Sequence, residues 1–137
     1  MDKGRAVYLA PSIGVRYLEL GVEDHRQLIA AAATWAAGEQ PSIRLLNAPR
    51  HLAMTAFRQI GRTLIHLVGS VCDDVMSPIA ELEPAHLVKL EIDLTAEPGD
   101  VKLFGDKASA DWTVSNDVLT IVISEVTAHV LVVAEEA

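Results

Sequence analysis

The sequence predicts a mainly β protein: an antiparallel β-sandwich preceded by one short strand and one α-helix. Two observations predict it. Beyond Pro41, the spacing of apolar residues changes from a helical period of about 3.6 to a strand period of 2. Several runs rich in β-branched residues then follow, separated by turn signals, which favours a sandwich over a helix-covered sheet. We therefore expect a strand-helix segment over residues 1–40 and the sandwich over residues 41–137.

The first segment begins with an apolar run over residues 5–10, which Pro11 ends. Such a run is typical of a strand buried on both faces. After a loop, Asp24 stands three residues before Gln27, a capping-box signal that predicts a helix start at Asp24. Apolar residues then recur at helical spacing, and Gly38 predicts the end of the helix.

The strands expected in the sandwich show a period of two or a run of β-branched residues. They cover residues 52–57, 63–68, 87–94, 101–104, 111–114, 118–123 and 126–133. Turns are expected at Gly61-Arg62, Pro98-Gly99, Gly105-Asp106, Ser115-Asn116-Asp117 and Ser124-Glu125. The clearest strand, 87–94, alternates apolar residues with Lys89, Glu91 and Asp93, so one face of its sheet is expected in water.

The composition excludes several classes of partner. Half of the 137 residues are apolar but only 4% are aromatic, so the core must consist mainly of aliphatic side chains. The formal charge of -8 repels phosphate backbones and anionic lipid, and no dense Lys/Arg cluster offsets it. We expect neither nucleic acid nor a membrane as a partner.

The location predicted for the chain is cytoplasmic. No stretch approaches the roughly 20 apolar residues that span a bilayer, and the first apolar run is too short for a secretory signal. The single cysteine, Cys72, has no second thiol for a disulfide, and the adjacent Asp73 and Asp74 disfavour its thiolate. Cys72 is therefore not expected to be reactive.

The short strand at the start requires a partner surface. A lone strand with one helix cannot bury both its faces, and it leaves a row of unpaired backbone groups. The sandwich, another copy of the chain or a larger α/β domain must cover Val7, Tyr8 and Leu9. We therefore expect a homo-oligomer or a complex, with these three residues binding the partner.

Three segments carry a resemblance to a known family. Residues 5–38 contain Arg-Ala-Val-Tyr-Leu-Ala-Pro-Ser-Ile-Gly, Tyr-Leu-Glu-Leu-Gly and Asp-His-Arg-Gln-Leu-Ile-Ala-Ala-Ala-Ala-Thr-Trp-Ala-Ala-Gly. They resemble the closing strand and helix of the class I glutamine amidotransferase-like domain of several glycoside hydrolases, often called the β-galactosidase trimerisation domain. Residues 62–69, with Leu-Ile-His-Leu-Val-Gly, resemble the His-Leu-Val-Asn strand of the sandwich that follows it, with Gly69 in place of Asn. Met-Ser-Pro-Ile-Ala-Glu-Leu at 76–82 resembles its Pro-Ile-x-Glu segment.

The resemblance implies a non-catalytic accessory or assembly module. In that family the hydrolytic carboxylates lie on an N-terminal (β/α)₈ barrel, and the amidotransferase-like domain serves assembly and helps frame the active site. This chain would correspond to the carboxyl-terminal end of such an enzyme. Its implied partners are another copy of itself or a glycoside hydrolase catalytic subunit.

No catalytic residues and no cofactor are expected. Glycosidases need two carboxylates about 5 to 10 Å apart beside a sugar-sized cleft. The paired acids Asp73-Asp74, Glu81 with Glu83, and Glu135-Glu136 instead indicate solvated loops or the chain end. A Gly-x-Ser-x-Gly nucleophile motif is also absent from the sequence.

The histidines do not predict a metal site. His25, His51, His66, His86 and His129 lack ligand spacing, although strands could bring the last three together. His66 lies in an apolar strand and is expected to be a hydrogen-bonded core residue.

Carbohydrate binding on the sandwich is the alternative function. Aromatic side chains can stack on sugar rings. Trp112 and Tyr17 are the candidate binding residues, with Tyr8, Phe57 and Phe104 as the other aromatics available.

Overall fold

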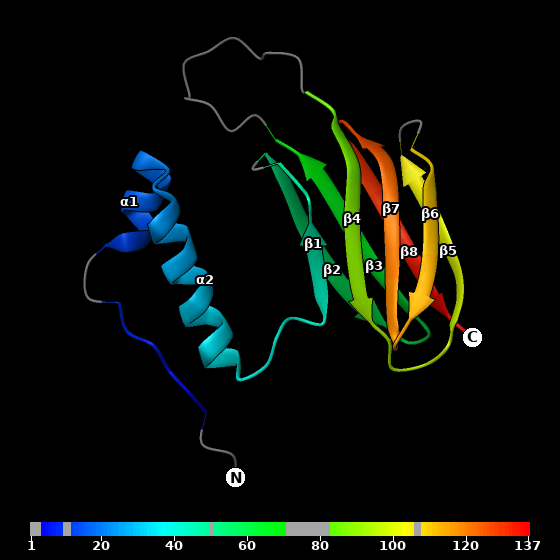
Figure 1. Cartoon of the computed structure of the whole chain (residues 1–137), viewed down its shortest axis with the longest axis horizontal. Helices are drawn as coiled ribbons and strands as arrows, with labels where there is room; N and C mark the ends of the chain where they lie inside the picture. The colour runs from blue at the N-terminus through cyan, green and yellow to red at the C-terminus, as the bar shows by residue number, and fades with distance from the viewer. Residues whose placement is uncertain (1–3, 10–11, 50, 71–82, 106–107) are drawn as a thin grey trace. The chain divides into compact units, whose positions relative to one another are not determined.

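The structure is a computed structural model that describes residues 4–9, 12–49, 51–70, 83–105 and 108–137 (Figure 1). The chain divides into two compact units, Met1–Pro41 and Ser42–Ala137. The first is helical and the second consists of strands.

The first unit is a pair of helices, α1 (Ile13–Leu20) and α2 (Glu23–Ala37), that contact each other. Gly21 joins them in the left-handed conformation, with φ 59°, and its N–H donates to the carbonyl of Tyr17 at 2.8 Å. The sequence predicts a loop where α1 lies. Helix α1 is only eight residues long, contains Gly14 in its first turn and ends at Gly21, so its periodicity is too short to be recognised.

Helix α2 has nearly the predicted span but begins differently. It starts at Glu23, its N-cap is Val22, and no side chain caps it. The predicted capping box of Asp24 and Gln27 is therefore wrong. The Gln27 side chain instead donates a hydrogen bond to the Glu23 carboxylate, which also accepts one from Arg26. The predicted end is confirmed: Gly38 has φ 82° and donates its N–H to the carbonyl of Thr34.

The structure contradicts the strand that the sequence predicts over residues 5–10. Its described part, residues 5–9, has no regular secondary structure. A strand forms only where a neighbour pairs its backbone, and both described sheets are built from residues beyond Ser42.

The second unit confirms the antiparallel β-sandwich. Its strands are β1 (Ile43–Leu46), β2 (Leu52–Gln59), β3 (Arg62–Gly69), β4 (Ala85–Asp93), β5 (Pro98–Gly105), β6 (Ala110–Ser115), β7 (Val118–Val126) and β8 (His129–Glu136). One sheet has the order β1-β4-β7-β6 and the other β2-β3-β8-β5, and every described pairing is antiparallel (Figure 1).

The core lies between the two sheets and is aliphatic. Fully buried side chains come from both sheets, among them Leu90 and Ile121 from the first and Ile65, Leu67 and Val132 from the second. Alternation along β4 buries Val88, Leu90 and Ile92 and turns Lys89, Glu91 and Asp93 outward, as the sequence predicts.

Tight turns connect two of the hairpins. Asn116 and Asp117, with φ 52° and 59°, link β6 to β7, the signature of a type I′ turn. Gly61, with φ 75°, lies in the turn between β2 and β3. Both turns overlap the predicted positions, but Arg62 and Ser115, which the sequence assigns to these turns, belong to β3 and β6.

Three details of the sandwich differ from the prediction. Strand β1 is not predicted, because it is only four residues long and includes Arg44. Residues 98–99 belong to β5, where the register shifts between Pro98 and Val101. The last turn lies at residues 127–128 rather than at 124–125, because β7 keeps its pairing with β4 as far as Val126.

None of the described helices is long and apolar enough to cross a membrane.

Candidate contact surfaces

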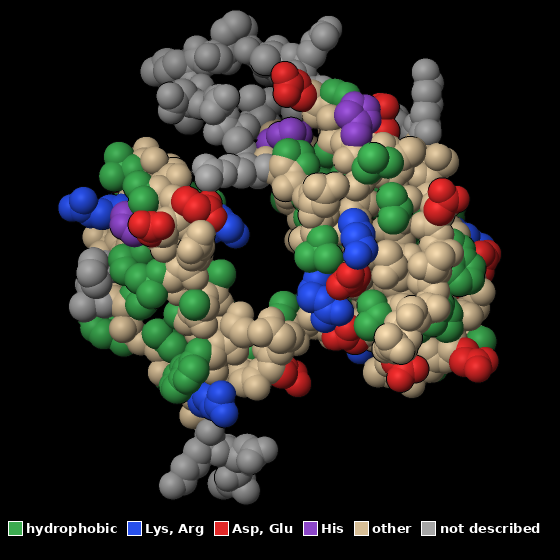
Figure 2. Space-filling model, in the orientation of Figure 1, with side chains coloured by type: hydrophobic (Ala, Val, Ile, Leu, Met, Phe, Trp, Pro, Cys, Tyr) green, Lys and Arg blue, Asp and Glu red, His purple; other side chains and the backbone are tan. Residues whose placement is uncertain are grey.

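The helical unit exposes most of its described apolar side chains. Ile13 is the only buried residue among those that the structure describes in this unit. Leu18 is 83% exposed, and the other exposed apolar residues are Val7, Tyr8, Val15, Leu20, Val22, Leu28 and Trp35. Figure 2 shows hydrophobic side chains across the surface of α1 and α2. We call this set the helical apolar surface. Because these side chains remain in contact with water, they contribute little hydrophobic stabilisation to the isolated unit.

Two of the three residues predicted to bind a partner, Val7 and Tyr8, belong to this surface. Val7 and Tyr8 are exposed, Tyr8 by 87%, and Leu9 is half-buried. Their segment is held to the end of α2 by Arg5, which donates to the carbonyl of Trp35 at 3.3 Å. The same guanidinium lies 5.6 Å from the centroid of the Trp35 ring, a cation–π contact.

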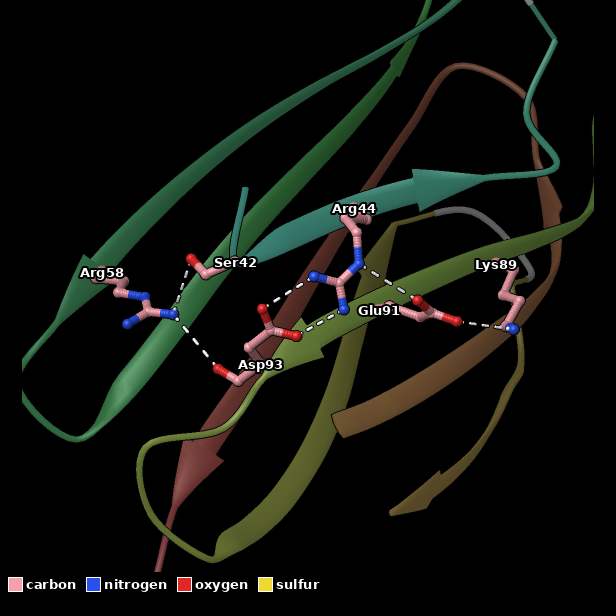
Figure 3. Close-up of polar contacts among 6 residues, drawn as sticks. All are labelled: Ser42, Arg44, Arg58, Lys89, Glu91 and Asp93. Atoms are coloured by element: carbon pink, nitrogen blue, oxygen red, sulfur yellow. Dashed lines mark hydrogen bonds and ion pairs between the residues drawn. The ribbon is translucent and has the colours of Figure 1, made fainter. Parts of the chain in front are cut away.

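The outer face of the β1-β4-β7-β6 sheet is polar and carries an ion-pair network (Figure 3). Arg44 on β1 donates twice to Asp93 on β4, at 2.9 and 2.6 Å, and once to Glu91 at 3.3 Å. Lys89 lies 2.9 Å from the other oxygen of Glu91. Arg58 donates to the hydroxyl of Ser42 at 3.2 Å (Figure 3).

This network shifts the ionisation of its members. The hydrogen bond to Asp93 raises the pKa of the Arg44 guanidinium, and the same bond lowers the pKa of Asp93. The hydrogen bond from Lys89 lowers the pKa of Glu91, with a further contribution from Arg44. The neighbouring cations therefore favour the ionised form of both carboxylates.

The outer face of the β2-β3-β8-β5 sheet is less polar. Phe57 on β2 and Phe104 on β5 are about half exposed, at 53% and 54%, and Val68 on β3 is 42% exposed. Half-buried Leu64 and Leu131 lie on strands between them. We call this face the apolar sheet face.

Charges on the apolar sheet face lie at one end of the strands. Lys102 on β5 donates to Glu135 on β8 at 2.8 Å, and this bond raises the pKa of the lysine. Arg62 donates to Gln59 at 2.8 Å. The rest of the face carries aliphatic and aromatic side chains together with Thr55 and two histidines.

Two of the three histidines considered together in the sequence meet on this face. The Nδ1 atom of His66 lies 3.0 Å from Nε2 of His129. The prediction that His66 is a core residue is wrong: its neighbours Ile65 and Leu67 point inward, so alternation turns His66 outward. His86 lies on the other sheet, 3.9 Å from a Glu125 carboxylate oxygen. The described residues contain no group of three or more candidate metal ligands.

The two candidate sugar-binding residues lie in different units. Trp112 on β6 is 40% exposed, and its cross-strand partner is the buried Ile121. Tyr17 is half-buried on α1.

A small hollow lies at one end of the sandwich, lined among others by Arg58, Thr63 and Glu136. Its volume of about 20 Å³ admits one water molecule but no sugar ring.

Several residues weighed in the sequence lie outside the described part of the chain. They are Cys72, Asp73, Asp74 and Glu81, together with the Met-Ser-Pro-Ile-Ala-Glu-Leu segment at 76–82.

The fold places this chain among proteins with a two-sheet antiparallel β-sandwich. No protein-family model and no curated protein sequence matches it. Among solved structures it is similar to the alpha-L-fucosidase isoenzyme 2 from Paenibacillus thiaminolyticus, with 18% identity and a TM-score of 0.74. The match covers 96% of this chain and 21% of the fucosidase chain. This chain therefore spans about a fifth of the fucosidase's length, and at this identity the likeness shows the fold alone.

Proposed function

We propose that this chain is a non-catalytic accessory or assembly module related to the carboxyl-terminal region of glycoside hydrolases, and that it mediates contacts between subunits. The observation that carries the proposal is the helical apolar surface. In the helical unit, Ile13 is the one buried residue among those described. Apolar side chains exposed together on one unit are typical of a surface that binds another protein.

Two further observations support the proposal. The fold is similar to a fifth of a glycoside hydrolase chain, the size expected of an accessory part. Residues 5–38 resemble the end of the trimerisation domain in that class of enzyme. We place Val7, Tyr8 and Leu9 at the contact, with another copy of the chain or a glycoside hydrolase catalytic subunit as the partner. Carbohydrate binding is the alternative proposal, with Trp112, which is 40% exposed on β6, and Tyr17 on α1 as the candidate residues.

Substitution of the exposed segment tests the proposal. The double variant Val7→Lys with Leu9→Lys should lower the oligomeric state of the chain, or its binding to a glycoside hydrolase catalytic subunit, because charge is costly to bury at an apolar contact. Size-exclusion chromatography with light scattering measures both. The melting of the sandwich should not change.

The matched control is Ser12→Lys with Gln40→Lys, which adds the same charge at two exposed polar positions of the same unit. This control should assemble like the unaltered chain. Equal assembly of the Val7/Leu9 variant would contradict the proposal. So would an unaltered chain that stays monomeric both alone and mixed with the catalytic subunit.

A further inference from the structure

Strand β2 forms an edge of its sheet. In the part of the chain that the structure describes, β2 pairs with β3 alone, over all eight residues from Leu52 to Gln59. Backbone N–H and C=O groups on its other side therefore need water or another strand as a partner. Short length, charge and proline protect most edge strands from added strands, but β2 contains no proline and only one charged residue, Arg58.

The inward side of β2 is incompletely covered. Alternation turns Leu52, Met54 and Ala56 toward the core, yet their burial falls along the strand: Leu52 is buried, Met54 is half-buried and Ala56 is exposed. On β3, by contrast, the inward residues Ile65 and Leu67 are completely buried. The apolar core is therefore open to water beside β2.

The outward side of β2 is largely apolar as well. Phe57 lies on the apolar sheet face and is 53% exposed. Ala53 and Thr55, which share its face, are also exposed. A strand added beside β2 would have one side against the open core and the other side continuing the apolar sheet face. Such a strand must therefore be uncharged and apolar on both sides.

Residues 6–9 have this pattern. Ala-Val-Tyr-Leu contains no charge, and in an extended chain Val7 and Leu9 lie on one side while Ala6 and Tyr8 lie on the other. The segment has no regular secondary structure and belongs to neither described sheet. Val7 is 42% exposed and Tyr8 is 87% exposed. The segment thus lacks a neighbouring strand, and β2 lacks one on its free side.

We propose that residues 5–9 of one copy of the chain add as a further strand to the free side of β2 in a second copy. This pairing rests on the proposed function, because it supplies the surface that the segment contacts. Val7 and Leu9 then cover the open core beside Ala56. Tyr8 lies on the apolar sheet face, where its hydroxyl stays in water. Backbone hydrogen bonds supply affinity and alternate side chains supply specificity, as in other cases of β-strand addition.

A second copy, rather than a different protein, fits both observations. Each copy of the chain has one segment without a neighbouring strand and one β2 edge with a free side. When two copies exchange their segments about a two-fold axis, both segments and both edges are paired at once. Assembly then stops at a dimer, because every β2 edge is occupied.

Charge on β2 tests the pairing. The double variant Thr55→Lys with Ala56→Lys puts one charge on each side of the strand at two exposed positions. The unaltered full chain should be a dimer by size-exclusion chromatography with light scattering. The variant should have the mass of a monomer, because a charge is costly to bury beside the added strand.

The matched control is Thr113→Lys with Val114→Lys, since both residues are exposed on β6, an edge strand of the other sheet. This control should stay a dimer. Circular dichroism should show an intact sandwich in both double variants.

A cross-link between chains locates the pairing without added charge. Each chain carries Cys72→Ser, so the introduced cysteine is the only thiol. Tyr8→Cys, mixed with a second chain, should form a disulfide under mild oxidation, since Cα atoms within about 7 Å can be bridged. The second chain carries one cysteine on the outward side of β2, tested singly at Ala53, Thr55 and Phe57. At least one of these should link, and Thr113→Cys on β6 should not.

The possible outcomes separate this pairing from the proposed function. The pairing is overturned if the Thr55/Ala56 variant dimerises like the unaltered chain, or if Tyr8→Cys links to no outward position of β2. A disulfide that forms only within a chain carrying both cysteines would overturn it as well. If Val7→Lys with Leu9→Lys still disrupts assembly in these cases, the proposed function holds and only the β2 surface is wrong. A chain that is monomeric alone but binds the catalytic subunit likewise overturns the second copy and keeps the proposed function.

Discussion

At the scale of single residues, Asp93 links the charge network to the pH dependence of stability. Its carboxylate accepts two hydrogen bonds from Arg44, which lower its pKa in the folded chain. A group with a lowered folded pKa contributes stability that is present above its unfolded pKa of about 3.9 and is lost as the pH falls through the folded value.

Asp93→Asn should therefore lower the free energy of unfolding at pH 7, and the difference from the unaltered chain should shrink below about pH 4. Urea unfolding followed by circular dichroism at pH 7, 5, 3 and 2 measures the difference. Asp111→Asn, an exposed carboxylate on the same sheet, is the control and should change little. If the difference in the free energy of unfolding between Asp93→Asn and the unaltered chain stays constant down to pH 2, the Arg44 contact does not stabilise the fold.

At the scale of elements, Gly69 determines how the β7–β8 turn packs against the end of β3. Its N–H donates to the carbonyl of Ala128 at 2.9 Å. A Cβ at this position would overlap the backbone oxygen of Thr127. The chain must therefore have glycine here, where the resembled family has Asn.

Gly69→Asn should destabilise the sandwich by about 1–3 kcal/mol, because the backbone must move to admit the side chain. Chemical denaturation measures the loss. Gly61→Asn is the control, since a Cβ there meets nothing within 4 Å and Asn accepts a positive φ. We expect the control to cost less than about 1 kcal/mol. Equal losses for the two variants would rule out the steric account.

The elements that the sequence predicts well are those whose pattern is local. Strands β2, β3, β4 and β7 have long apolar runs or clear alternation, and the type I′ turn has Asn116 and Asp117. The face of β3 was not predictable, because residues 64–68 are nearly all apolar and the run has no period of two. His66 therefore appeared buried, and its contact with His129 depends on a register that only the paired strands define.

In the first unit, the sequence predicts a strand that the structure does not contain. Residues 5–10 have the composition of a buried strand, but a strand also requires a neighbouring backbone, which composition does not supply. The exposure of the helical apolar surface was equally outside the reach of the sequence, because helical spacing identifies an apolar face without saying what covers it.

At the scale of the whole molecule, the two units should differ in their capacity to fold alone. The sandwich, Ser42–Ala137, has an aliphatic core from both sheets. The helical unit has helices of 8 and 15 residues with little burial, and isolated helices shorter than about 12–15 residues are marginal in water.

A fragment of residues 42–137 should therefore show the far-ultraviolet circular dichroism of a β protein and a cooperative thermal transition. A peptide of residues 1–41 should be largely unfolded until its partner is added. A strongly helical peptide with a cooperative transition of its own would contradict this division of stability.

The outermost strands of the sandwich differ in how easily they accept another chain. Strand β1 is four residues long, and β6 is six residues long and includes Asp111. Strand β5 contains Pro98, which has no N–H, together with a register shift. Strand β2 pairs without interruption over eight residues, and Arg58 is its only charged residue. Aggregation by backbone pairing between molecules would therefore begin along β2, so this strand is where solubility at high concentration is decided.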